Sequence, residues 1–483
     1  MSVALLAAVP EWITYFYQFT SYFILFLAAV ISTATATPIY ILLATRLGWV
    51  DQPGGRKRHE RATATMGGVV IFLVVTGGTL VALNLENLVG ERLREKAAYV
   101  YGLLACTGCM VLLGMVDDRH QIRPKIKLLV QTVVAIAAVS LGFRVQAITL
   151  PGFDSVELPV AVGVLASLLW IVGITNAINL TDGLDGLAAG ICFLASAVNA
   201  IVAIWLGNHY MTVMMVLLAG SLLGFLRWNF HPARVFLGDT GSLSLGMFLA
   251  LASLQSAQKA HTVVLILVPL FALGYPIFDT LLAVGRRMVR GQPLFASDRD
   301  HIHHRLVDRG RSPSAAAIQI YAASVIVCVL CLAAMTAHHF VLGLIILGVI
   351  LMALFSARVL GYLEWGGWAA RWSGRQETKV LHAAANLARL KIAQASNPQE
   401  LVRALAIIAP EIGCREIAVT VEGAETSWIE PGMLDDKGQG FEVSLSKGRK
   451  VRFTLSSDGE LDVERRSLVE ELAGLVGQRL STQ

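Results

Sequence analysis

Apolar segments of about 20 residues, the length that crosses a bilayer as an α-helix, recur along this chain from Tyr22 to Leu360. Short polar loops separate them. The composition agrees with membrane insertion: 55% of the residues are hydrophobic and 15% are charged, whereas soluble domains carry about 25% charged residues. The sequence therefore predicts an all-α, polytopic membrane protein.

We expect about eleven transmembrane helices, each near the bilayer-spanning length, within residues 1–362. They lie near residues 22–47, 67–85, 98–116, 128–142, a segment ending in the 176–186 loop, 187–206, 211–226, a segment after Ser242, 263–284, 315–336 and 341–360. Lys and Arg concentrate in the loops after the first, third, seventh and ninth helices, so the positive-inside rule makes that side cytoplasmic. The N-terminus is then outside and the C-terminus inside. Residues 144–157 alternate in polarity and predict a β-hairpin outside the bilayer.

The composition changes after Gly361, where the apolar segments end. We predict a linker at residues 363–374 and a small cytosolic α+β domain at residues 375–483. Periodicity predicts helices at 376–395, 399–409 and 463–480, and strands at 417–421, 440–445 and 451–455. No catalytic set of side chains stands out, so this domain is interpreted as a regulatory or interaction module. It resembles half of a GAF-like sensory domain.

Residues 176–186 (NAINLTDGLDG) form a polar stretch between two apolar segments. Asp182 and Asp185 are three residues apart, so one helical turn would place both carboxylates on one face. Ionisable groups beside a membrane helix are expensive to desolvate, which favours a functional role. The alternative is a solvated loop whose aspartates cap helices.

Five polar loops should converge on the cytoplasmic face, because all of them fall on that side of the predicted topology. Their carboxylates are ligands suited to a magnesium ion whose shell a substrate phosphate completes: Asp117, Asp118, Asp182, Asp185 and Asp239. Their cations are phosphate-complementary, although lipid headgroups and topology account for some of them: Arg56, Lys57, Arg61, Lys125, Lys127, Arg299 and Arg305. Asn179 and Asn229 could bind a base or sugar. This combination indicates phosphoryl-group chemistry between a soluble anionic donor and a lipid acceptor.

The histidine loop, residues 301–305 (HIHHR), adds His301, His303 and His304. Zinc would need a closed shell of nitrogen and sulfur ligands. No cysteine is nearby, so phosphate contact is the preferred interpretation. The formal net charge of +5 fits cytoplasmic loops and anionic lipid better than nucleic-acid binding. The six cysteines are interpreted as packing thiols.

Five of these stretches, in this order, resemble the cytoplasmic-loop motifs of the polyprenyl-phosphate N-acetylhexosamine-1-phosphate transferases: residues 66–68 (MGG), 114–118 (GMVDD), 179–186 (NLTDGLDG), 236–242 (FLGDTGS) and 301–305 (HIHHR). The resemblance covers residues from about 20 to 360 and leaves out the C-terminal domain. Ala64 departs from the family pattern, in which a proline is common at this place, and this puts the assignment of Arg61 in doubt.

The resemblance implies that a UDP-N-acetylhexosamine donates sugar-1-phosphate to undecaprenyl or another polyprenyl phosphate and releases UMP. Magnesium (or manganese) is the implied cofactor, with Asp239 as ligand and Asp182 as a second contact. Asp117 would deprotonate or orient the lipid phosphate and Asp118 would support it. The implied nucleotide-sugar pocket contains Asn179, Asp182, Asp185 and Asn229. The implied phosphate contacts are Arg61, Lys125 or Lys127, His301, His303, His304 and Arg305.

Several alternatives stay open at this stage. The HIHHR pattern is similar to the branch that starts envelope glycans on N-acetylglucosamine-type sugars, whereas three consecutive histidines are typical of phospho-MurNAc-pentapeptide transferases. Transfer could take one step or pass through an aspartyl-phosphate. A membrane transporter is the alternative from another class. The expected location is the bacterial plasma membrane, and a homodimer is a possible assembly.

Overall fold

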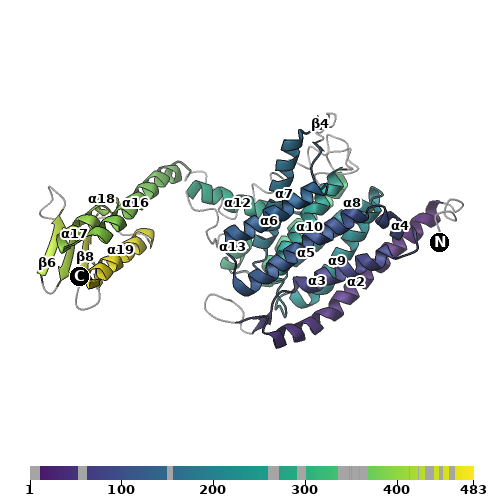
Figure 1. The fold of residues 1–483 in the computed structure, drawn as a ribbon, viewed down its shortest axis with the longest axis horizontal. Helices are drawn as coiled ribbons and strands as arrows, with labels where there is room; N and C mark the ends of the chain where they lie inside the picture. Colours follow the sequence, from purple (N-terminus) through teal and green to yellow (C-terminus); the bar gives the residue numbers. More distant parts are fainter. Residues whose placement is uncertain are drawn as a thin grey trace. The chain divides into compact units, whose positions relative to one another are not determined.

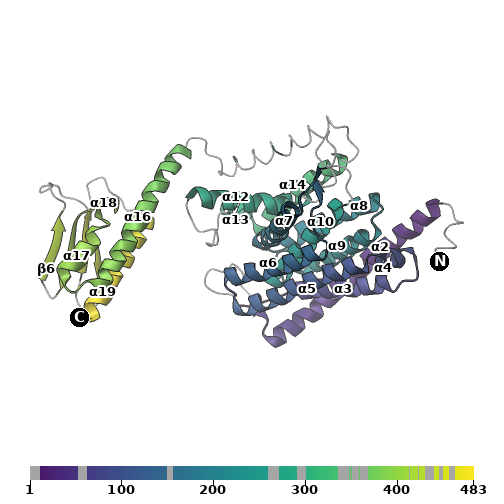
Figure 2. The same cartoon turned by 45° about the horizontal axis from the view of Figure 1, so that its top comes forward.

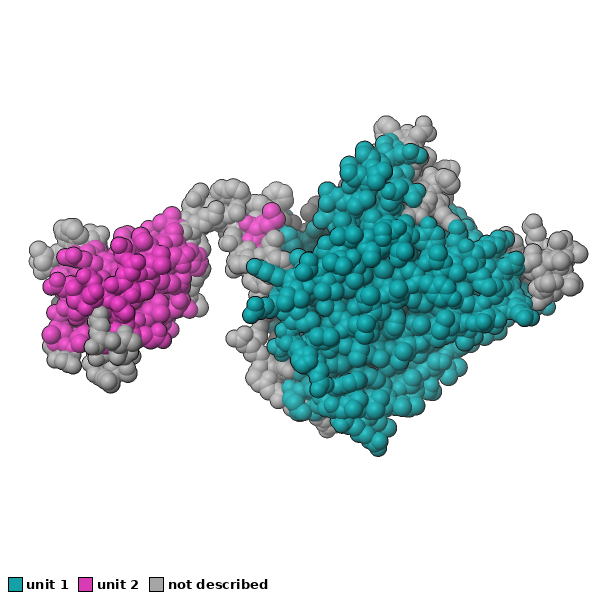
Figure 3. Space-filling model, viewed as in Figure 1, with its two compact units in different colours: residues 1–285, 295–363 teal, residues 286–294, 364–483 magenta. Residues whose placement is uncertain are grey.

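The computed structural model describes residues 11–52, 62–148, 156–258, 271–290, 301–334, 348, 350, 358, 368–412, 414–421, 424–429, 440–444, 450–455 and 463–482. The chain divides into two compact units, Met1–Gly285 with Phe295–Leu363, and Arg286–Leu294 with Glu364–Gln483 (Figure 3).

The first unit is a bundle of helices lying side by side (Figures 1 and 2). Its elements are α2 (Glu11–Leu47), β1 (Val50–Asp51), β2 (Thr63–Ala64), α3 (Gly68–Leu83), α4 (Leu88–Arg94), α5 (Ala97–His120), α6 (Pro124–Ser140), β3 (Ala147–Ile148), β4 (Val156–Glu157), α7 (Val160–Thr181), α8 (Leu187–Trp205), α9 (His209–Asn229), α10 (Gly238–Gln258), α12 (Gly274–Arg290), α13 (Ile302–Asp308) and α14 (Pro313–Ala334). Strands β3 and β4 pair antiparallel, which confirms the hairpin expected at residues 144–157.

Helix α10 is the centre of this bundle and packs against α3, α5, α7 and α8. Every face of α10 is buried within the stretch 245–251. Leu245, Met247, Phe248 and Leu251 are each at most 2% exposed. Small residues bring the neighbouring backbones close. A Cβ at Gly114 of α5 would collide with the backbone of Thr240, and one at Gly246 would collide with Thr175 of α7.

Six described helices are long and apolar enough to cross a membrane: α2 from Phe16, α5, α7, α8, α9 and α14 up to Ala333. The pair α3 and α4, bent by 106°, is a possible seventh span. Lipid-facing surfaces are apolar, as Ile31 and Leu42 on α2 and Leu169 on α7 are all more than 60% exposed. The protein is thus a multi-pass membrane protein.

The expected count of eleven spans is not confirmed. Helices α6 and α10 are not among the six candidate spans. Helix α6 has only 17 residues. Helix α10 is rich in Gly, Ser and Thr, and it is surrounded by protein rather than lipid. Most of the expected segment at 341–360 and residues 263–270 of that at 263–284 lie outside the described residues.

The second unit has α and β elements around its own core. They are α16 (Trp368–Gln394), α17 (Pro398–Ala406), α18 (Ala409–Ile412), β5 (Cys414–Val421), β6 (Ala424–Ile429), β7 (Gly440–Ser444), β8 (Lys450–Leu455) and α19 (Val463–Thr482). The antiparallel sheet has the order β6-β5-β8-β7. Fully buried Leu405, Ile417, Phe453 and Leu472 join the helices to it. The three expected strands and three helices are present, but β6 was not predicted, and α16 begins inside the expected linker.

Candidate active site

The Met-Gly-Gly turn is joined by backbone hydrogen bonds to the loop that precedes α10. Phe236 N donates to Ala64 O at 2.7 Å, Gly67 N donates to Phe236 O at 3.0 Å, and Gly68 N donates to Leu237 O at 3.2 Å. A Cβ at Gly68 would collide with the backbone of Gly241. Glycine at this turn therefore lets the first polar loop fix the position of Asp239, which directly follows Gly238.

Asp118, at the end of α5, holds the N-terminus of α10. Its Oδ1 accepts the Asp239 N–H at 2.8 Å, and its Oδ2 accepts the Thr240 N–H at 3.1 Å and the Thr240 hydroxyl at 2.7 Å. A helix N-terminus leaves backbone N–H groups without helical partners, and a carboxylate satisfies them with charge assistance. Asp118 thus positions the Asp239 backbone.

Lys127, in the first turn of α6, lies between two carboxylates. Its Nζ is 2.7 Å from Asp239 Oδ2 and forms a second ion pair with Asp117 Oδ2. Asp117 is only 5% exposed, and its Oδ1 accepts the Ile122 N–H at 2.7 Å. One ammonium group therefore joins the end of α5 to the start of α10.

Asn179 approaches Asp239 from α7. Its Nδ2 donates to Asp239 Oδ1 at 2.6 Å and to Ser242 Oγ at 2.8 Å. Asp239 Oδ1 thus accepts a hydrogen bond from Asn179, and Oδ2 accepts one from Lys127. A carboxylate oxygen has more than one lone pair, so Asp239 could also reach a metal ion.

Asp182 directly follows α7, which ends at Thr181. Among the described residues, nothing donates a hydrogen bond to its side chain or pairs with its charge. Burial, followed by the nearby charges of Asp239, Asp118 and Asp185, raises its pKa well above 3.8. Five carboxylates share this region with one contacting lysine, so a divalent cation would complement the charge.

Asp185 and Asn229 hold the loop between α9 and α10. Asp185 Oδ2 lies 2.8 Å from His231 Nδ1 and accepts the Ala233 N–H at 3.1 Å. Asn229 is buried, and its Nδ2 donates to Val235 O at 2.8 Å. Both residues were expected to line a nucleotide-sugar pocket; their observed contacts shape the loop between α9 and α10.

The histidine loop lies against the 182–186 loop. His301 and His303 are buried, and their rings stack with centroids 5.7 Å apart. A Cβ at Gly183 would collide with His303 Nε2. Burial, with a smaller effect of His304, lowers the pKa of His303 to about 3, so the ring is neutral at physiological pH.

Comparison with known proteins identifies a matching family and several relatives. Residues 100–257 match the family described as glycosyl transferase family 4. A probable undecaprenyl-phosphate N-acetylglucosaminyl 1-phosphate transferase of Bacillus subtilis is 39% identical over 300 residues, which are 61% of this chain and 80% of the relative. A decaprenyl-phosphate N-acetylglucosaminephosphotransferase of Mycobacterium tuberculosis is 34% identical over 319 residues, 61% and 78% respectively. A phospho-N-acetylmuramoyl-pentapeptide-transferase of Geobacillus kaustophilus is 33% identical over 301 residues, 57% and 86%.

This chain belongs to the polyprenyl-phosphate N-acetylhexosamine-1-phosphate transferase family.

Several residues that were expected in the site do not contact the clustered carboxylates in the described part of the chain. Lys125 is exposed, and Lys127 makes both ion pairs. Arg305 is half-buried in α13, next to His304, whose ring is 4.3 Å from that of His303. Arg56, Lys57, Arg61 and Arg299 lie outside the described residues.

Four residues that contact the site or the histidine loop were not predicted as site residues: Ser242, Thr240, His231 and Asp279, whose Oδ2 lies 2.9 Å from His301 Nδ1. Ser242 and Thr240 occur within the FLGDTGS motif, so a reading of the whole motif could have included them. His231 and Asp279 carried a weaker signal, a lone histidine in a loop and a carboxylate inside an apolar segment.

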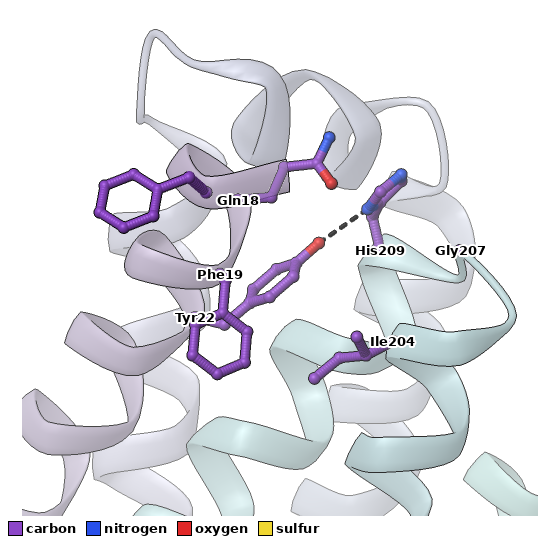
Figure 4. A pocket seen from close by; sticks show the side chains of 7 residues that line it. Gln18, Phe19, Tyr22, Ile204, Gly207 and His209 are labelled. Atoms are coloured by element: carbon purple, nitrogen blue, oxygen red, sulfur yellow. Dashed lines mark hydrogen bonds between the residues drawn. The ribbon is translucent and has the colours of Figure 1, made fainter. Parts of the chain in front are cut away.

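A cavity of about 440 Å³ lies at the other end of the bundle, lined by Phe16, Gln18, Phe19, Tyr22, Ile204, Gly207 and His209 (Figure 4). The Tyr22 hydroxyl faces His209 Nδ1 at 2.7 Å. Helix α8 starts beside Asp185 and ends at Trp205, next to this cavity. The cavity is therefore separate from the carboxylate site.

Proposed function

We propose that this protein transfers N-acetylhexosamine-1-phosphate from a UDP-sugar to undecaprenyl or another polyprenyl phosphate, releasing UMP and starting a lipid-linked envelope glycan. The observation that carries the proposal is the contact of Lys127 and Asn179 with Asp239, which joins three of the loops that bear the family motifs. The names of the Bacillus and Mycobacterium relatives support the donor and acceptor classes.

The proposed reaction is a single displacement at phosphorus. An oxygen of the polyprenyl phosphate attacks the β-phosphorus of the UDP-sugar and forms a new P–O bond. The bond from the β-phosphorus to the bridging oxygen breaks, and UMP leaves with that oxygen. Positioning and charge neutralisation account for most of phosphoryl-transfer catalysis.

Asp117 is proposed to orient the acceptor phosphate or take up its proton, and Lys127 to neutralise charge between acceptor and donor. The Asp117 side chain is nearly inaccessible and both of its oxygens are engaged. This supports an orienting role over a nucleophilic one. A phosphosugar trapped covalently on an aspartate would overturn the one-step proposal.

Magnesium is the proposed cofactor. The lone pairs of Asp239 and the carboxylate of Asp182, which has no hydrogen-bond or ion-pair partner among the described residues, fit a hard cation that also takes phosphate oxygens. When bound, the ion would stabilise negative charge on the diphosphate. Asp239 and Asp182 would hold it, while Asn179 keeps Asp239 in place.

The proposed donor is a simple UDP-N-acetylhexosamine. The HIHHR loop and the 39% identity to the Bacillus N-acetylglucosaminyl 1-phosphate transferase, against 33% for the Geobacillus muramoyl-pentapeptide enzyme, support this choice. Exclusive use of UDP-MurNAc-pentapeptide would contradict it.

The proposed topology has about eleven spans near the bilayer-crossing length. The N-terminus is outside a bacterial plasma membrane, and the carboxylate face and residues 375–483 are cytoplasmic. The basic loops support this orientation. Cysteine labelling of whole cells at the exposed residues 84 and 86, against the exposed residues 121 and 231, tests it. The protein is further proposed to act as a homodimer, which cross-linking in membranes would test.

The activity itself is tested with purified enzyme, undecaprenyl phosphate and a panel of labelled UDP-sugars, with and without magnesium. We expect UMP release and a lipid-linked diphosphosugar in equal amounts. Asp239→Asn serves as the inactive control. Absence of UMP release with every UDP-N-acetylhexosamine would contradict the proposal.

A further inference from the structure

Asp279 is a buried carboxylate of α12 with two hydrogen-bond donors from the histidine loop. Its Oδ2 lies 2.9 Å from His301 Nδ1, and its Oδ1 accepts the Ile302 N–H at 2.9 Å. Asp279 is 2% exposed and His301 is 4% exposed. A buried charge requires close partners, and among the described residues these partners come from the loop after α12.

The contact with Asp279 orients His301. A carboxylate beside Nδ1 keeps the proton on that nitrogen and leaves Nε2 at the opposite edge of the ring for another partner. The Ile302 N–H belongs to the first residue of α13, so the same carboxylate also fixes where that helix starts.

His303 connects this arrangement to the 182–186 loop. Its Nδ1 lies 3.2 Å from the Tyr275 hydroxyl and 3.9 Å from Asp279 Oδ2. Its ring is nearly parallel to that of His301, at 11°, and its Nε2 edge lies against Gly183. An ordered set of contacts thus runs from Asp279 through His301 and His303 to the residue that follows Asp182.

We propose that Asp279 is a positioning residue for sugar-phosphate transfer, which through His301 and His303 sets the position of the histidine loop against Gly183 and so the fit of the nucleotide-sugar donor. The inference rests on the proposed function, because it assumes that the 182–186 loop contacts the donor. The acceptor contacts on Asp117 and Lys127 are not part of this set. The effect of losing Asp279 should therefore fall on the donor KM more than on the acceptor KM.

The test compares Asp279→Asn with Thr280→Val. Asparagine keeps the size of the side chain but leaves only one carbonyl oxygen for two donors. Thr280 is the next residue on α12, and its buried hydroxyl has no partner among the described residues, so its replacement should leave activity unchanged. We expect Asp279→Asn to raise the donor KM by about 10- to 100-fold, the usual effect of removing an orienting partner, with the acceptor KM changed less than about threefold.

A double-mutant cycle separates positioning from a general structural role. If Asp279 acts through His301, adding Asp279→Asn to a His301→Gln variant should raise the donor KM by less than about threefold. If Asp279→Asn does not fold, Tyr275→Phe replaces it, because it removes the hydroxyl beside His303 Nδ1 without leaving a buried charge; it should raise the donor KM selectively.

The inference is overturned if the effects of Asp279→Asn and His301→Gln on the donor KM multiply in the double variant. It is also overturned if Asp279→Asn raises the donor KM and the acceptor KM equally. In both cases the wild type still releases UMP, so the proposed function stands. With Tyr275→Phe as the substitute, an unchanged donor KM overturns it. A wild type that releases no UMP overturns the proposed function, and the inference with it.

Discussion

Lys127 Nζ lies 2.7 Å from Asp239 Oδ2, although the two residues are 112 positions apart in the chain. Lys127 also pairs with Asp117. Within the described part of the chain, it is the only lysine or arginine in ion-pair contact with the five clustered aspartates. The charge of this one side chain therefore affects both the proposed acceptor contact and the proposed metal ligand.

Replacing Lys127 should remove most turnover. Lys127→Met leaves Asp117 and Asp239 without their shared cation, and loss of such a contact at a reacting phosphate costs about 10²- to 10³-fold in kcat. Lys125→Met is the matched control, since Lys125 is exposed two residues earlier on α6. UMP release is the measurement. Equal losses in the two variants would show that Lys127 has no special role.

Asp118 should matter for stability as well as for activity. Asp118→Ala removes the acceptor of three hydrogen bonds at the N-terminus of α10. Loss of a helix cap costs about 0.5–2 kcal/mol of stability. Thr240→Val removes only the hydroxyl bond, so thermal unfolding in detergent should rank wild type, Thr240→Val and Asp118→Ala in decreasing stability. An Asp118→Ala variant as stable as wild type would contradict the capping role.

The sequence was sufficient for the membrane class and for which loops meet, because helix length, loop charge and motif order are local properties. Asp239, Asp117 and Asn179 were expected in one site, and they meet there. The structure refines the role expected of Asp118, because its oxygens accept hydrogen bonds from the backbone of α10. The sequence alone could not reveal this contact, since the residues it joins are 121 positions apart.

Other features could not be predicted for specific physical reasons. The sequence left the choice between Lys125 and Lys127 open, since the face that a lysine takes depends on how α6 packs. The contact between Asp279 and His301 forms because the histidine loop packs back against α12, the helix that precedes it, and this packing cannot be predicted from local sequence. Strand β6 was missed because its residues Ala424–Ile429 (AETSWI) alternate weakly and are mostly exposed.

The burial of His303 should make the folded protein less stable in acid. Its pKa is about 3 in the folded state, against 6.5 for an exposed histidine, so the unfolded chain binds the extra proton between these values. Stability from this residue is complete above about pH 6.5 and falls as pH decreases toward 3, by at most about 1.4 kcal/mol per pH unit. The melting temperature of His303→Gln should therefore change less than that of wild type between pH 7.5 and 5. Parallel curves would contradict this assignment.

Magnesium affinity should increase with pH. The raised pKa of Asp182 means that binding of a cation must compete with a proton on this carboxylate. The magnesium concentration for half-maximal UMP release should then fall as pH rises from 6 to 8. Asp182→Asn should require more magnesium and lose this pH dependence. Removal of the metal with EDTA should abolish release in both proteins, and excess magnesium should restore it. A wild-type requirement that does not change with pH would exclude titration of Asp182.

Removing residues 364–483, which form most of the second unit, should leave the transfer reaction intact. Every described residue proposed to contact substrate or metal lies before Leu363, and the second unit has a separate hydrophobic core built around Leu405, Ile417 and Phe453. A chain ending at Leu363 should keep kcat/KM within about threefold of the full-length enzyme, because the hydrophobic core of residues 381–480 contains no residue of the first unit's core. Residues 364–483 expressed alone should show a cooperative unfolding transition, which checks that this unit folds independently. A loss of more than about tenfold in the shortened chain, with its melting temperature unchanged, would instead mean that the second unit takes part in catalysis.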